Sequence, residues 1–171
     1  MINVDSQGIP IALSLGANLG DRLHALRYAI KSMSAIIQDI IVSNVYETEP
    51  VGFKEQPSFL NCACIGYTYS TLEEIMVAIN AVHQALHRKP RPKWHEREID
   101  IDILLFGDSV IESEHIMIPH PRLHERAFVL RPLSDIAPEM IHPLKQKTIQ
   151  ALMASCEDDS AVVFHCDSTV I

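Results

Sequence analysis

Residues 94–106 read Trp94-His-Glu-Arg-Glu-Ile-Asp-Ile-Asp-Ile-Leu-Leu-Phe106, and this stretch is the most informative part of the sequence. Its second half alternates between isoleucine and aspartate, which is the period of a β-strand. Residues i and i+2 of a strand share a face and lie about 6.5 Å apart along the chain. We therefore expect Asp100 and Asp102 to project side by side from a strand that continues into the apolar core.

Two neighbouring carboxylates at the edge of a core repel each other, and a cation between or in front of them makes the pair tolerable. A solvated strand face would show the same alternation. The segment just upstream, however, holds five of the fourteen Lys and Arg residues, namely Arg88, Lys89, Arg91, Lys93 and Arg97. Carboxylate oxygens beside a basic loop favour a divalent metal, Mg²⁺, that holds a polyphosphate.

The composition indicates one domain over residues 1–171, because 47% of the 171 residues are hydrophobic and such a chain can bury a sizeable core. The net charge of −8 argues against a nucleic-acid partner. No apolar run is long enough for a membrane helix, and residues 1–7 lack the features of a secretory signal. The four cysteines form no Cys-x-x-Cys pair and suggest packed free thiols. We expect a soluble cytoplasmic monomer.

Hydrophobic periodicity predicts strands over 9–15, 40–47, 59–69 and 99–106, with helices over 21–37 and 71–86. This order indicates an α+β fold of the ferredoxin-like sandwich type: a mostly antiparallel four-stranded sheet with both helices on one face and a loop-lined substrate groove on the other. On the third strand, Phe59 and Asn61 share the groove face, whereas Cys62 and Cys64 face the helices. Beyond residue 107 we expect helical turns over 125–136 interrupted at Pro132, a short helix over 148–155 and one further strand in the tail.

Three further features are candidates for ligand contacts. The segment Gly16-Ala-Asn-Leu-Gly20 follows a strand, but it matches neither phosphate-loop pattern and favours a tight turn. His120 stands between two prolines, and with Arg122 and Arg126 it forms a second basic cluster that could contact phosphate. Trp94, the one tryptophan, lies in a polar loop and could close over a planar ligand.

These motifs occur together, in one order, in a known family. They are Gly16-Ala-Asn-Leu-Gly20, Tyr46-x-Thr-x-Pro-Val-Gly52, Gln56-Pro-x-Phe-Leu-Asn61, Trp94-x-x-Arg-x-Ile-Asp-Ile-Asp-Ile-Leu-Leu-Phe-Gly107, and Pro119-His120 followed by Arg126-x-Phe-Val-Leu-x-Pro-Leu133. Over residues 9–155 the chain resembles the 6-hydroxymethyl-7,8-dihydropterin pyrophosphokinase family of folate biosynthesis; residues 156–171 stay unassigned. The resemblance implies transfer of the pyrophosphoryl group of ATP to the pterin hydroxymethyl group, with release of AMP. The alternative is a nucleotide- and pterin-binding module that has lost catalysis.

The resemblance also implies a role for each matching residue. Asp100 and Asp102 would bind two Mg²⁺ ions, and Arg88 and Arg97 would stabilise the transferring group. The ATP contacts would be Trp94, Ile103, His120 and Arg126. The pterin would be held by Thr48, Val51, Phe59, Asn61 and Phe128, with its ring between the two phenylalanines. The chain departs from the family pattern at His95-Glu96, where Gly-Pro is usual, and at His83, where a glutamate often contacts the ribose.

Overall fold

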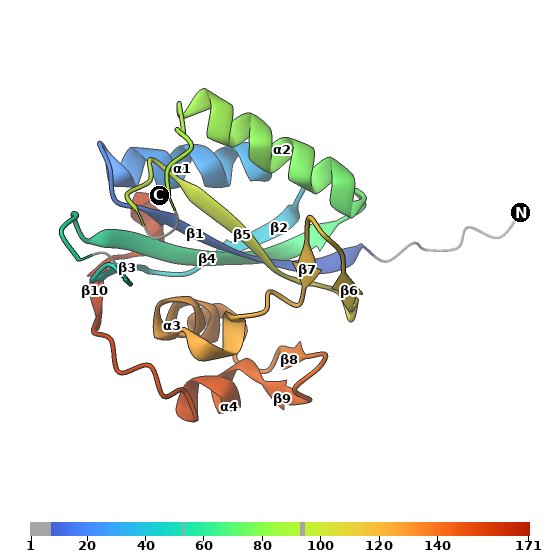
Figure 1. Ribbon diagram of the computed structural model, residues 1–171. Coiled ribbons are helices and arrows are strands. Elements are labelled where there is room, and N and C mark those ends of the chain that lie inside the picture. Colours follow the sequence, from blue (N-terminus) through green and yellow to red (C-terminus); the bar gives the residue numbers. More distant parts are fainter. Residues whose placement is uncertain (1–7, 53, 93–94) are drawn as a thin grey trace, which may run out of the picture.

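The computed structural model describes residues 8–52, 54–92 and 95–171, and it has helices on both sides of a central antiparallel sheet (Figure 1). The strands are β1 (Ile9–Ala17), β2 (Gln38–Val42), β3 (Val45–Thr48), β4 (Phe59–Thr68), β5 (Asp100–Phe106), β6 (Ile111–Glu112), β7 (Met117–Ile118), β8 (Ile141–His142), β9 (Lys147–Thr148) and β10 (Val162–Cys166). The α-helices are α1 (Arg22–Met33), α2 (Leu72–Ala85), α3 (Ala127–Ile136) and α4 (Ile149–Ala154). Every helix within these ranges is too short or too polar to bridge a bilayer.

The main sheet has the strand order β10-β3-β4-β1-β5, and β2 pairs with the other half of β4. All its pairings are antiparallel, which confirms the predicted α+β class. It has six strands where four were expected. The strand predicted over 40–47 is two strands, because Ser43 interrupts it and uses its own hydroxyl to accept a hydrogen bond from the Ala63 N–H. The expected strand in the tail is β10, which extends the sheet beside β3.

One face of the sheet packs against α1 and α2 (Figure 1), as the periodicity predicts. Leu13 and Leu15 of β1 and Leu60, Cys62 and Cys64 of β4 enter this core together with the apolar stripes of both helices. Both helices begin where a side chain accepts a hydrogen bond from an early helical N–H group. Helix α2 begins with a capping box, in which Thr71 and Glu74 hydrogen-bond reciprocally.

The opposite face is only partly a groove, because α3 and α4 cover a portion of it (Figure 1). Ala12 and Ala63 of the sheet pack there against Val129, Leu130 and Leu133 of α3. The expected interruption at Pro132 is wrong: α3 runs continuously from Ala127 to Ile136 with the proline inside it. A proline within a helix costs about 3 kcal/mol, and the burial of the apolar face of α3 offsets this cost.

A β-bulge in β5 changes the phase of that strand. Ile103 pairs with Leu13 and Leu105 pairs with Ala12, so Leu104 is the additional residue. Before the bulge, Asp102 pairs with Ser14 and faces the groove side; after it, Leu105 faces the same side and joins the core under α3. The Leu104 carbonyl accepts a hydrogen bond from the His120 N–H at 2.9 Å. The bulge therefore places the polar Asp102 and the apolar Leu105 on one face of β5. Its extra residue, Leu104, also fixes the position of the His120 backbone.

Replacing Leu13 with alanine should strongly destabilise the fold. Leu13 is fully buried in the central strand, and a buried Leu→Ala change leaves a cavity that lowers the free energy of unfolding by about 2–5 kcal/mol. The matched control is Ile41→Ala, because Ile41 is 53% exposed on β2 and should change stability by about 0.5–1 kcal/mol at most. Urea unfolding measures both values, and equal losses in the two variants would contradict the assignment of the core.

Candidate active site

A cavity of about 250 Å³, here called the sheet cavity, opens on the groove side of the sheet between the strands and the start of α3. It brings together ten of the residues proposed from the sequence: Thr48, Val51, Phe59, Asn61, Arg97, Asp100, Asp102, His120, Arg126 and Phe128. They come from β3 and the loop after it, from β4 and β5, from the segments that precede β5 and α3, and from the first turn of α3. Residues that are far apart in sequence therefore surround one space.

The paired carboxylates lie where the alternation of β5 predicts. Asp100 lies opposite Gly16 and Asp102 opposite Ser14, so both face the sheet cavity. The Arg88 guanidinium lies 3.0 Å from Asp100 Oδ1, and Arg97 Nε lies 3.5 Å from Asp100 Oδ2. Arg88 also donates a hydrogen bond to the Ile99 carbonyl at 3.0 Å. Two arginines therefore offset the charge of Asp100 from the side of the basic loop.

Asp102 has no comparable arginine contact in the described part of the chain; its nearest basic partner is His120, whose Nε2 lies 3.9 Å from Asp102 Oδ2. Partial burial and the charge of Asp100 raise the pKa of Asp102 to about 6. Burial and the positive charges of Arg126 and Arg122 lower the pKa of His120 to about 4, so its ring is neutral at pH 7. Of the two carboxylates, Asp102 therefore has the weaker contacts with basic side chains among the described residues.

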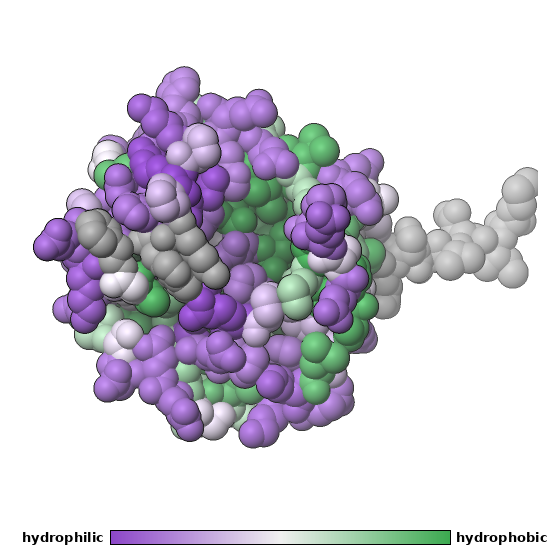
Figure 2. Space-filling view, in the orientation of Figure 1, coloured by the Kyte–Doolittle hydropathy of each residue, from purple (hydrophilic) through white to green (hydrophobic). Residues whose placement is uncertain are grey.

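A second cavity, of about 400 Å³ and here called the hairpin cavity, lies between α2, β5 and the β6–β7 hairpin. Figure 2 shows a hollow with apolar residues in this position. Met76, Ile79, Ile101, Ile103 and Ile116 give it an apolar lining, and Asn80 and Ser113 add neutral polar groups. Because β5 is the last strand of the sheet, residues from both of its faces border the hairpin cavity. Asp102 and His120 line both cavities, which meet at these two side chains.

Asn61 is held in place at the other end of the sheet cavity. It is buried, and its Nδ2 donates a hydrogen bond of 2.7 Å to Thr48 Oγ1. A Cβ atom at Gly16 would lie 2.7 Å from Asn61 Oδ1, which is too close for a real contact. Gly16 is thus a residue of β1 whose missing side chain makes room for Asn61, and the turn expected at 16–20 begins after Ala17.

Asn18 connects three segments that border the site. Its Oδ1 accepts a hydrogen bond from the Arg97 N–H at 2.7 Å, and its Nδ2 donates to Gln56 Oε1 at 3.0 Å and to the Pro57 carbonyl at 2.9 Å. The Arg97 carbonyl in turn accepts from the N–H groups of Asn18 and Leu19. This arrangement fixes the backbone of Arg97 just before the carboxylate strand.

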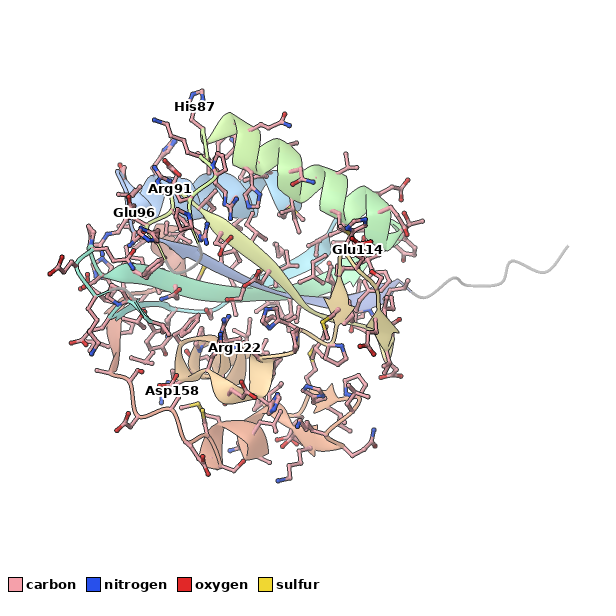
Figure 3. The ribbon with its side chains drawn as sticks, viewed as in Figure 1. His87, Arg91, Glu96, Glu114, Arg122 and Asp158 are labelled. Atoms are coloured by element: carbon pink, nitrogen blue, oxygen red, sulfur yellow. The ribbon has the colours of Figure 1, made fainter. Side chains whose placement is uncertain are left out.

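The basic loop is less positive than its composition suggests. The Arg91 guanidinium makes two hydrogen bonds of 2.7 Å with the Glu98 carboxylate, and Glu96 lies within 3.5 Å of it. Hydrogen bonding from Arg91 lowers the pKa of Glu98 to about 2. Figure 3 shows Arg91 and Glu96 close together in the loop before β5. Arg91 is therefore engaged within the loop, whereas Arg88 and Arg97 are directed at Asp100.

Of the described site residues proposed from the sequence, Arg88 and Ile103 do not line the sheet cavity. Arg88 contacts it through Asp100, Ile103 borders the hairpin cavity, and Trp94 lies outside the described residues. The sequence interpretation missed Ser14, Gly16, Glu49 and His95, which also line the sheet cavity. For Ser14 and Gly16 a signal existed, because small residues recur at i, i+2 within an otherwise apolar strand.

Comparison with known proteins identifies relatives of this arrangement. The profile of the family described as 7,8-dihydro-6-hydroxymethylpterin-pyrophosphokinase matches residues 12–138. A 2-amino-4-hydroxy-6-hydroxymethyldihydropteridine pyrophosphokinase of Aquifex aeolicus is 39% identical over 140 residues, covering 82% of this chain and 88% of the relative. Its namesake from Bacillus subtilis is 38% identical over 130 residues, covering 75% and 78%.

Other relatives are much longer proteins. The folic acid synthesis protein fol1 of Pneumocystis carinii is 36% identical over 91% of this chain, which spans only 21% of that protein. A crystal structure of HPPK-DHPS in complex with substrates superposes with a TM-score of 0.67 at 15% identity, covering 86% of this chain and 43% of that chain. The wild-type HPPK-DHPS of Plasmodium falciparum superposes with a TM-score of 0.63 at 18% identity, covering 86% and 43%. These solved structures share the fold.

The raised pKa of Asp102 predicts a pH-dependent effect of Asp102→Asn. An aspartate titrates near 3.9 in the unfolded chain and at about 6 in the folded protein. The stability contributed by its proton is therefore fully present below about pH 4 and is lost as the pH rises through about 6. In metal-free buffer we expect the melting temperature of the wild type to fall relative to Asp102→Asn over this range. Asp108→Asn, at an exposed site, should follow the wild type, and a difference independent of pH would refute the shift.

Proposed function

This chain belongs to the 7,8-dihydro-6-hydroxymethylpterin-pyrophosphokinase family, and we propose that it transfers the pyrophosphoryl group of ATP to the hydroxymethyl group of 6-hydroxymethyl-7,8-dihydropterin across the two cavities described above. The products are the pterin diphosphate and AMP, and the reaction is a step of folate biosynthesis. One observation carries the assignment of the site: the two cavities meet at Asp102 and His120. Substrates in the two cavities would therefore present their reacting groups to each other beside the carboxylate pair.

We assign the pterin to the sheet cavity. Phe59 of β4 and Phe128 of α3 offer aromatic surfaces for a flat heterocycle. The Asn61 amide presents both an acceptor and a donor, which suits the polar edge of a pterin. Thr48, the last residue of β3, and Val51, in the loop after it, would add contacts. In this orientation the hydroxymethyl group lies toward Asp100 and Asp102.

We assign the nucleoside of ATP to the hairpin cavity. Its apolar lining suits a purine base, and Ile103 would lie against this base. His120 and Arg126 would contact the phosphates as these cross from one cavity to the other. Trp94 stays a candidate closing residue that lies outside the described part of the chain.

The donor set at Asp100 and Asp102 fits Mg²⁺. Within residues 8–52, 54–92 and 95–171, no three His, Cys, Asp or Glu side chains gather to hold a metal alone. Mg²⁺ often binds through one or two carboxylates and completes its coordination with water and substrate phosphates. When bound, Mg²⁺ neutralises phosphate charge and orients the transferred group. The raised pKa of Asp102 is consistent with a carboxylate that needs such a cation. We expect two Mg²⁺ ions at these carboxylates.

Arg88 and Arg97 are the proposed catalytic residues. Phosphoryl-type transfer depends on positioning and on charge stabilisation more than on covalent chemistry of the protein. Both guanidinium groups contact Asp100. With substrate present, they would stabilise the charge that develops on the transferred phosphates. We also propose a cytoplasmic monomer; all four cysteines, which lie within the described residues, are free thiols and agree with a reducing compartment.

The reaction product tests the proposed function. The protein is incubated with Mg²⁺ and ATP, with and without 6-hydroxymethyl-7,8-dihydropterin, and the nucleotides are separated by chromatography. AMP should form only with the pterin, at one AMP for each pterin diphosphate. Formation of ADP, or ATP hydrolysis without the pterin at a similar rate, would exclude pyrophosphoryl transfer. Binding of both ligands without turnover would instead indicate a module that has lost catalysis.

The metal assignment predicts large and specific losses of rate. Asp100→Asn and Asp102→Asn should each lower kcat by roughly 10³-fold or more, because each removes an anionic ligand that acts in the transition state. The folded state of each variant should be at least as stable as that of the wild type, since the repulsion between the two carboxylates is relieved. Asp108→Asn is the matched control and should retain full activity. Near-normal turnover of either site variant in Mg²⁺ would refute the metal site.

A further inference from the structure

Helix α3 begins at the wall of the sheet cavity, and its first N–H group needs an acceptor. Ala127 is the first helical residue and is buried, between the cavity residues Arg126 and Phe128. The residue at the N-cap position is Arg126. A side chain at the N-cap position accepts from the second or third helical N–H group, and an arginine side chain carries only donors. The Ala127 N–H therefore needs an acceptor from another segment of the chain.

Asp158, in the segment between α4 and β10, supplies this acceptor (Figure 3). Its Oδ2 accepts a hydrogen bond of 2.9 Å from the Ala127 N–H. Its Oδ1 accepts from the Ser160 N–H at 3.1 Å and from the Ser160 hydroxyl. Burial raises the pKa of Asp158, but the hydrogen bonds from Ser160 and Ala127 outweigh it and hold the pKa below its usual value. Asp158 is therefore ionised at neutral pH, which favours its place at the positive end of a helix.

The part of the chain that follows Asp158 is held in place by contacts with β3 and with α1. After Ser160 it enters β10, in which Val162 pairs with Thr48 at the end of β3. Thr48 accepts the hydrogen bond from Asn61. Beyond β10, the Arg27 guanidinium of α1 donates to the Val170 carbonyl at 2.6 Å. The tail thus runs from α4 past the edge of the sheet to the α1 side (Figure 1). On the way it contacts Ala127, which precedes Phe128, and Thr48, which accepts the hydrogen bond from Asn61.

We propose that Asp158 is a positioning residue for the pterin end of the active site, acting through the first turn of α3 on Phe128 and Arg126. This inference rests on the proposed pterin site. Asp158 lies beyond residues 12–138, the part of the chain that matches the family profile. Without its carboxylate the buried Ala127 N–H loses its acceptor, and the turn must shift to recover one. Because Phe128 follows at the next position, a shift of this turn moves the aromatic surface of the cavity.

The test compares Asp158→Ala with Asp158→Asn and with the exposed neighbour variant Asp159→Ala. Pterin binding is followed by the fluorescence of 6-hydroxymethylpterin without nucleotide. Asp158→Ala should weaken it about tenfold, since small displacements of positioning groups have effects of this order or larger. Asp158→Asn keeps an oxygen acceptor and should stay within about threefold of the wild type, and Asp159→Ala should match the wild type. Binding of AMP, which lacks the outer phosphates, should be the same in all four proteins.

Two outcomes would overturn the proposal. A lower melting temperature for Asp158→Ala with unchanged pterin affinity would show that the residue only stabilises the fold. Asp158→Asn binding as weakly as Asp158→Ala would show that the acceptor at Ala127 is not the cause. Should Asp158→Ala fail to fold, Ser160→Ala removes a hydroxyl that holds Asp158 and should weaken pterin binding about threefold; unchanged affinity would then overturn it. Failure of the wild type to bind the pterin would instead refute the proposed function.

Discussion

The repulsion between two carboxylates on β5 is the constraint on which the rest of this site depends. Asp100 and Asp102 share one strand face, and their negative charges repel each other. Two arginines from the preceding loop offset the negative charge of Asp100. Asp102 instead has a raised pKa and lies beside a neutral histidine. This asymmetry gives a bound cation and an anionic substrate a strong electrostatic reason to occupy the place where the two cavities meet.

The position of β5 at the edge of the sheet explains how one strand can serve two ligands. An interior strand has neighbours on both sides, whereas β5 has β1 on one side and an open edge on the other within the described sheet. The hairpin cavity borders this edge, so Asp102 and Ile103 both line it although they project to opposite faces. The bulge at Leu104 then returns the strand to the core beneath α3. Strand position, register and bulge together separate the hairpin cavity, proposed for the nucleotide, from the sheet cavity, proposed for the pterin.

Much of this architecture is predictable from local sequence pattern. The period of two placed Asp100 and Asp102 on one face, and the same rule placed Phe59 with Asn61 and away from Cys62. The pattern could not reveal that α3 covers the groove side, because Pro132 argues locally against a helix that tertiary packing nevertheless stabilises. It also could not reveal contacts such as that of Asp158, whose partner lies 31 residues away in the chain. Pairings of that kind are set only when the layers assemble.

The hydrogen bonds of Asn18 have a consequence for which chemical groups this position can accept. Both of its Nδ2 hydrogens point at oxygen atoms, and its oxygen receives an N–H group, so the amide has one workable orientation. Aspartate has the same shape, yet it would set an anionic oxygen against the Gln56 side chain and the Pro57 carbonyl, both of which are acceptors here. Leucine would fill similar space but would make none of these three hydrogen bonds. The arrangement of donors and acceptors around position 18 therefore requires asparagine there. Neither the size of the side chain nor its preference for helix or strand would predict this requirement.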